Sequence, residues 1–108
     1  MAKNLLDPGP ATADAVLLHV ADAKRYALVD LRLDLERRSG TIPGALHITM
    51  ADLDARADEI DGPVVFVCAD GGRSISAAIR FREAGRPAWA LHGGFSAWQL
   101  AGEPTERG

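Results

Sequence analysis

The chain holds a single cysteine, Cys68, and the residues that follow it are of the types that stabilise a thiolate. Gly71 and Gly72 let the backbone approach an anion closely, while Arg73 and Ser74 can supply a positive charge and a hydroxyl. The thiolate is the nucleophilic form of cysteine, and a nearby cation or the amino end of a helix favours it. The spacing therefore predicts a cysteine that reacts as a nucleophile at neutral pH.

The residues around Cys68 have the pattern of a strand, a turn and a helix. Val64 to Val67 form a run of β-branched and aromatic side chains, typical of a strand buried on both faces of a parallel sheet. From Ser74 onward apolar residues recur at helical spacing, and Gly85 supplies the stop. The turn between them, Ala69 to Gly72, should place unpaired N–H groups around the point where the sulfur emerges, so we expect it to cradle an anion.

Two charged residues and the cysteine itself also have a structural interpretation. A lone cysteine after an apolar run is more often a core residue, and it is the setting of Cys68 that favours a reactive thiol. The carboxylate of Asp70 opposes ionisation of a neighbouring thiol and repels an anionic donor, so we expect it to face solvent. Arg32, at the carboxyl end of another predicted strand, could bind substrate at the rim of the site. Alternatively, it forms an ion pair with a carboxylate such as that of Glu36.

Three segments, taken in order along the chain, resemble the motifs of the rhodanese family. Cys68, Gly71, Arg73 and Ser74 match the active loop of that family, Cys-x-x-Gly-x-Arg-Ser. Upstream, the segments 29–32 and 40–45 are similar to its Asp-x-Arg and Gly-His-Ile-Pro-Gly-Ala motifs, with Thr41 in the place of the histidine. Downstream, the segment 93–98 is similar to its closing Gly-Gly-x-x-x-Trp. The resemblance covers residues 12–102, and the departure at Thr41 concerns local packing more than chemistry.

The resemblance implies a sulfurtransferase that works through a persulfide on Cys68. A donor such as thiosulfate would give up its sulfane sulfur to the Cys68 thiolate, and a thiophilic acceptor such as cyanide or a thiol would remove it. The loop from Ala69 to Ser74 would bind the anion, and no cofactor would be needed. The partners implied are a small-molecule sulfur donor and acceptor, and a sulfur-carrying protein is also compatible.

Two alternatives stay open. One is a rhodanese-like module that relays sulfur or binds a partner protein without being an enzyme. The other is a cysteine phosphatase or arsenate reductase, whose loop also joins a strand to a helix. Those loops have five residues between the cysteine and the arginine, whereas only four separate Cys68 from Arg73. A loop of this length should be too tight for a tetrahedral oxyanion.

Predicted strands and helices alternate along the chain. The strands are expected at residues 26–31, 46–48, 64–67 and 88–91, and the helices at 12–23, 33–38, 49–60, 74–84 and 95–100. This pattern predicts an α/β fold, an open parallel sheet of about four or five strands with helices on both faces and a ligand crevice at the carboxyl ends of the strands. We expect one domain over residues 1–108, with its core at 12–102 and an irregular lead-in at 1–11.

Composition and charge narrow the classes of function. Hydrophobic residues make up 47% of the chain and charged residues 25%, which is ordinary globular usage. The net charge of −3 offers no basic stripe for nucleic acid. No apolar run approaches the ~20 residues of a membrane span, and the amino end lacks the apolar stretch of a signal peptide, so we expect a cytoplasmic protein. The three histidines show no metal-ligand spacing with Cys68, and no metal site is predicted.

Overall fold

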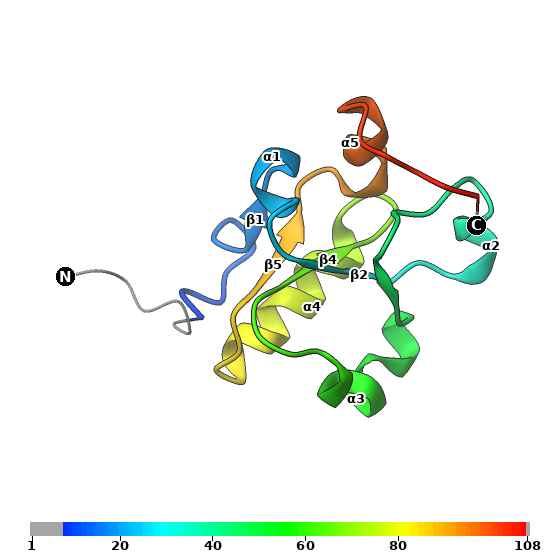
Figure 1. Cartoon of the computed structure of the whole chain (residues 1–108). Helices are drawn as coiled ribbons and strands as arrows, with labels where there is room; N and C mark the ends of the chain where they lie inside the picture. Colours follow the sequence, from blue (N-terminus) through cyan, green and yellow to red (C-terminus); the bar gives the residue numbers. More distant parts are fainter. Residues whose placement is uncertain (1–7, 108) are drawn as a thin grey trace.

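A five-stranded parallel sheet forms the centre of the structure, a computed structural model that describes residues 8–107 (Figure 1). Its strands, in spatial order, are β1 (Leu17–Leu18), β5 (Ala88–Leu91), β4 (Val64–Val67), β2 (Ala27–Asp30) and β3 (Leu46–His47). All neighbouring strands pair in parallel, with Val65 of β4 opposite Leu28 of β2 and Trp89 of β5. The predicted α/β parallel sheet is therefore confirmed. Strand β4, which leads into Cys68, is its central strand.

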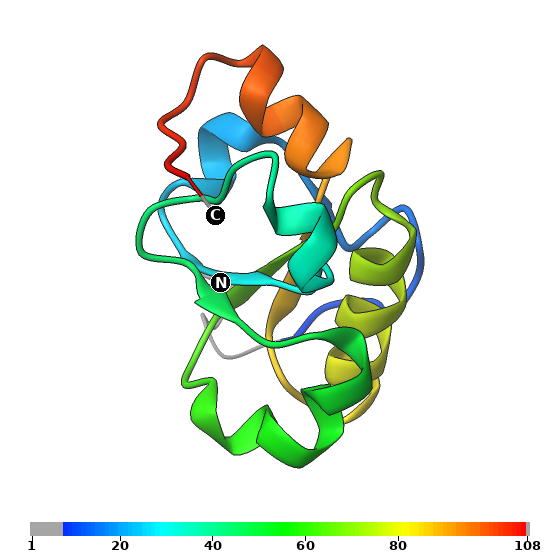
Figure 2. The same ribbon diagram turned by 90° about the vertical axis from the view of Figure 1, so that its right-hand side faces the viewer.

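Helices cover both faces of this sheet (Figures 1 and 2). One face packs against α3 (Leu53–Arg56) and α4 (Gly72–Glu83), and the other against α1 (Val20–Ala23) and α5 (Gly94–Leu100). Short 3-10 turns, η1 (Met50–Asp52) and η2 (Ala57–Glu59), flank α3, and α2 (Asp34–Arg37) follows β2. The longest helix within residues 8–107 is α4 with 12 residues, and none there has the length and apolar character to cross a membrane.

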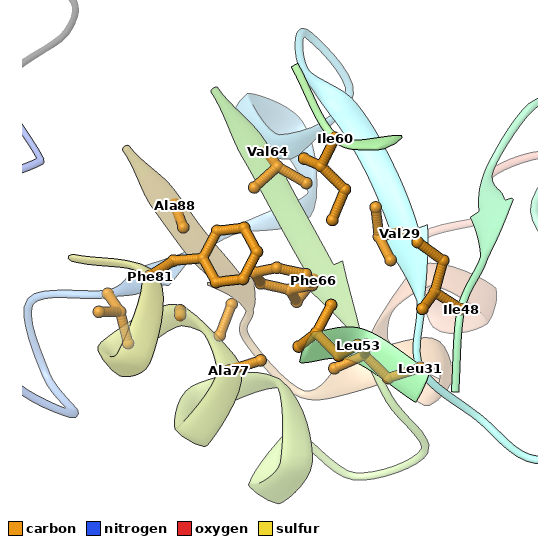
Figure 3. Packing of buried hydrophobic residues seen from close by; sticks show 13 residues of the cluster. Val29, Leu31, Ile48, Leu53, Ile60, Val64, Phe66, Ala77, Phe81 and Ala88 are labelled. Atoms are coloured by element: carbon orange, nitrogen blue, oxygen red, sulfur yellow. The ribbon is translucent and has the colours of Figure 1, made fainter. Parts of the chain in front are cut away.

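The side chains of β4 alternate between the two layers of the core. Val64 and Phe66 point to the α4 face, where the ring of Phe66 meets the ring of Phe81 edge-on at 4.9 Å (Figure 3). Val65 and Val67 join the cluster on the α1 and α5 face. All four residues of β4 are 0% exposed, and each such side chain contributes about 1.5–3 kcal/mol by leaving water. The core thus holds the strand that ends at Cys68 firmly in place.

The structure corrects two predicted elements. The helix expected at residues 12–23 is wrong, because residues 13–16 form a turn, Leu17 and Leu18 form the edge strand β1, and only Val20–Ala23 is helical. The helix expected at 49–60 is broken into η1, α3 and η2. Residues 8–11 are irregular as predicted, whereas the rest of the predicted lead-in, residues 1–7, lies outside the described part of the chain.

Candidate active site

Cys68 follows the last residue of β4, and the loop after it turns two backbone N–H groups toward its sulfur. The N–H of Gly71 donates to Sγ over 3.0 Å and the N–H of Ser74 over 3.4 Å. The hydroxyl oxygen of Ser74 also lies 3.4 Å from Sγ and donates its own proton to the Gly71 carbonyl over 3.0 Å. These N–H groups belong to the first turn of α4, where no helix carbonyl is available to them, so they are free to stabilise negative charge on sulfur.

The loop takes this shape because of Gly71 and Asp70. Gly71 is the N-cap of α4 with φ of 112°, a left-handed conformation that a residue with a Cβ rarely adopts. Asp70 closes the turn, since its Oδ1 accepts the N–H of Gly72 over 3.1 Å. Asp70 is exposed, as expected, yet this bond keeps its carboxylate next to the loop, with Oδ1 4.0 Å from the sulfur of Cys68.

Cys68 is 0% exposed, so its sulfur lies beneath the loop that is expected to cradle an anion. Its backbone is covered by the start of α5, because the N–H of Phe95 donates to the Cys68 carbonyl over 2.8 Å. Ser74 is equally buried. A molecule that is to react with Sγ therefore has to displace groups at the surface of the loop before it makes contact.

Arg73 is paired with Glu36 rather than free to meet an anion. Its two terminal nitrogens donate to Glu36 Oε1 and Oε2 over 2.7 Å each, joining α2 to the start of α4, two elements that Figure 2 shows on the same side of the molecule. These bonds, together with a bond that Glu36 accepts from the Leu33 N–H, lower the pKa of Glu36 from 4.5 to about 2. They also raise the pKa of Arg73, with smaller contributions from the negative charges of Cys68 and Asp70. The sequence analysis considered Glu36 only as a partner for Arg32 and did not connect it with the loop after Cys68.

Arg32 is not on the rim of the site. It is 2% exposed and forms a buried ion pair with Asp30, over 2.9 Å between Nη2 and Oδ2. The structural ion pair expected for Arg32 is thus present, but its partner is the carboxylate of Asp30 and not that of Glu36, whose backbone carbonyl accepts from Arg32 over 3.3 Å. Arg32 also donates one bond to the Gly40 carbonyl over 2.8 Å, and its guanidinium lies over the Phe95 ring, 3.9 Å from the centroid. Arg32 therefore supports the segment that carries Glu36.

Among residues 8–107, no group of three or more His, Cys, Asp or Glu side chains gathers as metal ligands would. Thr41, in the place of the family histidine, is buried and pairs through its backbone with Glu106, in bonds of 2.8 and 2.9 Å. The Thr41 hydroxyl adds a bond of 3.4 Å to the Glu106 carbonyl, so the side chain at this departure contacts the carboxyl-terminal segment.

Comparison with known proteins shows that the chain belongs to the rhodanese-like domain family, whose family model matches residues 12–101. The putative sulfurtransferase YtwF of Bacillus subtilis is 35% identical, over 78% of this chain and 82% of its own length. Thiosulfate sulfurtransferase GlpE of Pseudomonas aeruginosa is 40% identical, over 67% of this chain and 68% of its own. The HTH-type transcriptional regulator Rv0324 of Mycobacterium tuberculosis is 38% identical over 94% of the chain, which spans only 46% of that relative.

Solved structures share the fold of this chain. A protein of unknown function from Rhodopseudomonas palustris, described as a possible tyrosine phosphatase, matches with a TM-score of 0.76 and 32% identity, over 87% of this chain and 88% of its own. An NAD-dependent persulfide reductase from A. fulgidus matches with a TM-score of 0.64 and 32% identity, over 76% of this chain and 16% of that larger one.

Proposed function

We propose that the protein is a sulfurtransferase that carries sulfane sulfur as a persulfide on Cys68. The observation that supports this most is the pair of N–H groups, from Gly71 and Ser74, directed at the Cys68 sulfur. Relatives named as sulfurtransferases, at 35% and 40% identity, point to the same chemistry. A lone thiol remains reduced in the cytoplasm, and we place the protein there.

The reaction runs in two displacements. In the first, the Cys68 thiolate attacks the outer sulfur of a donor such as thiosulfate, the donor S–S bond breaks, and sulfite leaves with the bonding electron pair. In the second, an acceptor such as cyanide or a thiolate attacks the terminal sulfur and releases the Cys68 thiolate. Each step exchanges one bond to sulfur for another, so the cycle needs no redox partner and no cofactor. A covalent intermediate of this kind implies ping-pong kinetics.

The loop from Ala69 to Ser74 stabilises the negative charge on sulfur during this cycle. The Gly71 and Ser74 N–H groups stabilise the thiolate before transfer and the terminal sulfur after it. The Ser74 hydroxyl can turn from the Gly71 carbonyl to the sulfur, because both lie within its reach. Gly71 and Gly72 let the backbone lie close to the sulfur. The charges of Asp70 and Arg73 determine the electrostatic potential that an approaching donor meets.

Steady-state kinetics test the proposal. Cys68→Ser should keep the fold and abolish thiosulfate-to-cyanide transfer, since the chain holds no other thiol. Plots at several fixed acceptor concentrations should give parallel lines in double-reciprocal form. Turnover that persists in pure Cys68→Ser protein would falsify the proposal.

A second candidate function is that of a cysteine phosphatase, favoured by the description of the Rhodopseudomonas palustris protein. The four residues between Cys68 and Arg73 argue against it, and the pairing of Arg73 with Glu36 withholds the cation that a phosphate would need. The wild type should therefore show negligible hydrolysis of an aryl phosphate. A glycine inserted between Gly71 and Gly72 should weaken sulfur transfer, because it moves the N–H groups away from Sγ.

The domain could also relay sulfur for a partner protein rather than complete a cycle with small molecules. The matches to one part of a transcriptional regulator and one part of a persulfide reductase favour this form of the same chemistry. A relay loads sulfur on Cys68 but transfers it slowly to cyanide or free thiols. A relay would be identified by a sulfur-carrying partner protein that binds the wild type and no longer binds the Cys68→Ala variant.

A further inference from the structure

We propose that Glu36 and Asp70 make this site select sulfur donors without an anionic head group, namely persulfides of uncharged thiols, over thiosulfate. This inference rests on the proposed function, because it concerns which donor loads Cys68. It assigns Glu36 and Asp70 as residues that determine donor specificity. Three features of the site support it: the state of Arg73, the position of Asp70, and the apolar rim beside Glu36.

The cation nearest the loop is already occupied. Arg73 meets Glu36 through two parallel bonds of 2.7 Å, the geometry in which arginine binds a carboxylate most strongly. The SO3 group of thiosulfate, like that carboxylate, is an oxygen anion that accepts hydrogen bonds from a guanidinium. To use Arg73, thiosulfate has to displace Glu36 and leave its carboxylate unpaired near the incoming anion. The pair thus opposes the binding of an anionic donor.

Asp70 adds a second negative charge at the sulfur itself. Its Oδ1 lies 4.0 Å from Cys68 Sγ and is held there by the Gly72 N–H. Thiosulfate carries two negative charges and has to bring its outer sulfur into contact with Sγ. Its sulfonate group therefore approaches Asp70 at the distance where like charges repel even near the surface of a protein.

Other nearby arginines do not offset these carboxylates. Arg32 is buried against Asp30, and Arg37 lies 3.6 Å from the same carboxylate. Arg38, which is exposed, lines a cavity formed with residues of the carboxyl-terminal segment, including Thr105 and Arg107. The ionised groups described at the loop, Glu36, Arg73 and Asp70, sum to one negative charge before the thiolate is added.

A persulfide of an uncharged thiol avoids this repulsion. In its protonated form, R–S–SH, the outer sulfur is attacked by the Cys68 thiolate, the S–S bond breaks, and R–S⁻ leaves. The thiolate that leaves then takes the proton from the new Cys68–S–SH group, which ends as Cys68–S–S⁻ beside the Gly71 and Ser74 N–H groups. Atoms and charge balance, and no oxidant or reductant is required.

The rim next to Glu36 suits an apolar carrier of this kind. Leu33 and Leu35 are 56% and 68% exposed, and they stand on either side of Asp34 directly before Glu36 in the chain. The Leu33 N–H donates to Glu36 Oε1 over 2.8 Å, which ties this rim to the Arg73 pair. These two exposed leucines offer apolar surface beside Glu36, and the carboxylate of Asp34 between them is exposed as well.

Two donors that differ by one charge test the inference. The persulfide of N-acetylcysteine methyl ester carries no charge apart from that of the persulfide group, and the persulfide of N-acetylcysteine adds one carboxylate on the same skeleton. Thiosulfate is the third donor. The rate at which each adds one sulfur to Cys68 is followed by intact mass in single-turnover experiments, for the wild type, Glu36→Gln, Asp70→Asn and the double variant.

We expect the ratio of anionic-donor rate to ester-persulfide rate to rise roughly tenfold in each single variant and further in the double variant, with both effects shrinking at high salt. The amide introduced by Glu36→Gln retains an oxygen for the Leu33 N–H, and the exposed Asp70→Asn provides a second variant should Glu36→Gln fold poorly. Glu59→Gln removes an equivalent exposed pair with Arg56 at the amino side of β4 and should leave the ratio unchanged.

Ratios that stay the same in all variants, or that fall in Glu36→Gln, overturn the inference while leaving the sulfurtransferase proposal intact. Absence of labelling by every donor in the wild type overturns the sulfurtransferase proposal and this inference with it. A ratio that rises equally in Glu59→Gln also counts against the inference, because the effect would then follow net charge rather than these two residues.

Discussion

Gly94 lies directly against the carbonyl group of Cys68. A Cβ added to Gly94 would overlap that carbonyl oxygen and would come within 2.8 Å of the Ala69 carbonyl oxygen as well. The next residue, Phe95, donates its N–H to the Cys68 carbonyl over 2.8 Å. The Gly-Gly segment at the start of α5 therefore supports the strand end that presents the sulfur, although it contributes no group to the chemistry.

Gly94→Ala should lower the free energy of unfolding by about 2–3 kcal/mol, because the new methyl group meets backbone that cannot easily move. Gly102→Ala is the matched control. Its φ of 73° is close to the 62° of Gly94, but nothing lies within 4 Å of its Cβ position. The control should cost only about 1 kcal/mol, from the left-handed backbone alone. Equal losses in urea unfolding would show that the close approach to Cys68 is not what constrains Gly94.

Asp30→Ala should destabilise the protein by about 3–5 kcal/mol, because it leaves the guanidinium of Arg32 buried without its carboxylate. Glu59→Ala, which removes an exposed partner of Arg56, should change the stability far less, because solvent screens an exposed pair. Urea unfolding of both variants measures the difference. A loss for Asp30→Ala as small as that for Glu59→Ala would contradict the buried pair.

The parts of the fold that the sequence predicts are those with a strong local pattern. The apolar run of β4, the turn after Cys68 and the helical spacing of α4 all appear where expected. Strand β1 was missed because its two residues, Leu17 and Leu18, are too few to show an alternation, and they are a strand only through pairing with β5. Such an edge strand depends on contacts between residues far apart in sequence.

The site was predicted less completely for the same reason. The Cys68 loop follows from residues that are adjacent in the chain, whereas Glu36 and Arg73 are joined only by the fold. A sequence shows that both carry charge but not which partner each finds. Arg32 illustrates this, since two carboxylates, Asp30 and Glu36, lie within a few residues, and the one that it meets depends on burial.

The ion pair between Glu36 and Arg73 should make stability depend on pH. The folded-state pKa of Glu36, about 2, lies below its ordinary value of 4.5, so the stabilisation is fully present above pH 4.5 and is lost as the pH falls toward 2. Glu36→Gln should cost about 1–2 kcal/mol at pH 7, after allowance for solvent screening, and much less at pH 3. A difference between the two proteins that stays constant from pH 7 to pH 3 would argue against this pair.

Ser74→Ala should slow the loading of sulfur on Cys68 by several-fold with little loss of stability. The variant removes the hydroxyl 3.4 Å from Sγ, while the Gly71 carbonyl keeps its bond from the Ile75 N–H. Ser76→Ala, on the exposed side of the same helix, serves as the control and should leave the rate unchanged. Identical loading rates in the two variants would show that the hydroxyl plays no part.

The central claim is that Cys68 carries the transferred sulfur, and intact mass spectrometry tests it most directly. The reduced wild-type protein is incubated with thiosulfate or an alkyl persulfide, freed of donor and measured before and after treatment with cyanide. We expect the mass of one added sulfur, removed by cyanide, in the wild type, and no addition in Cys68→Ser. Added sulfur on Cys68→Ser, or none on the wild type with any donor, would contradict the account.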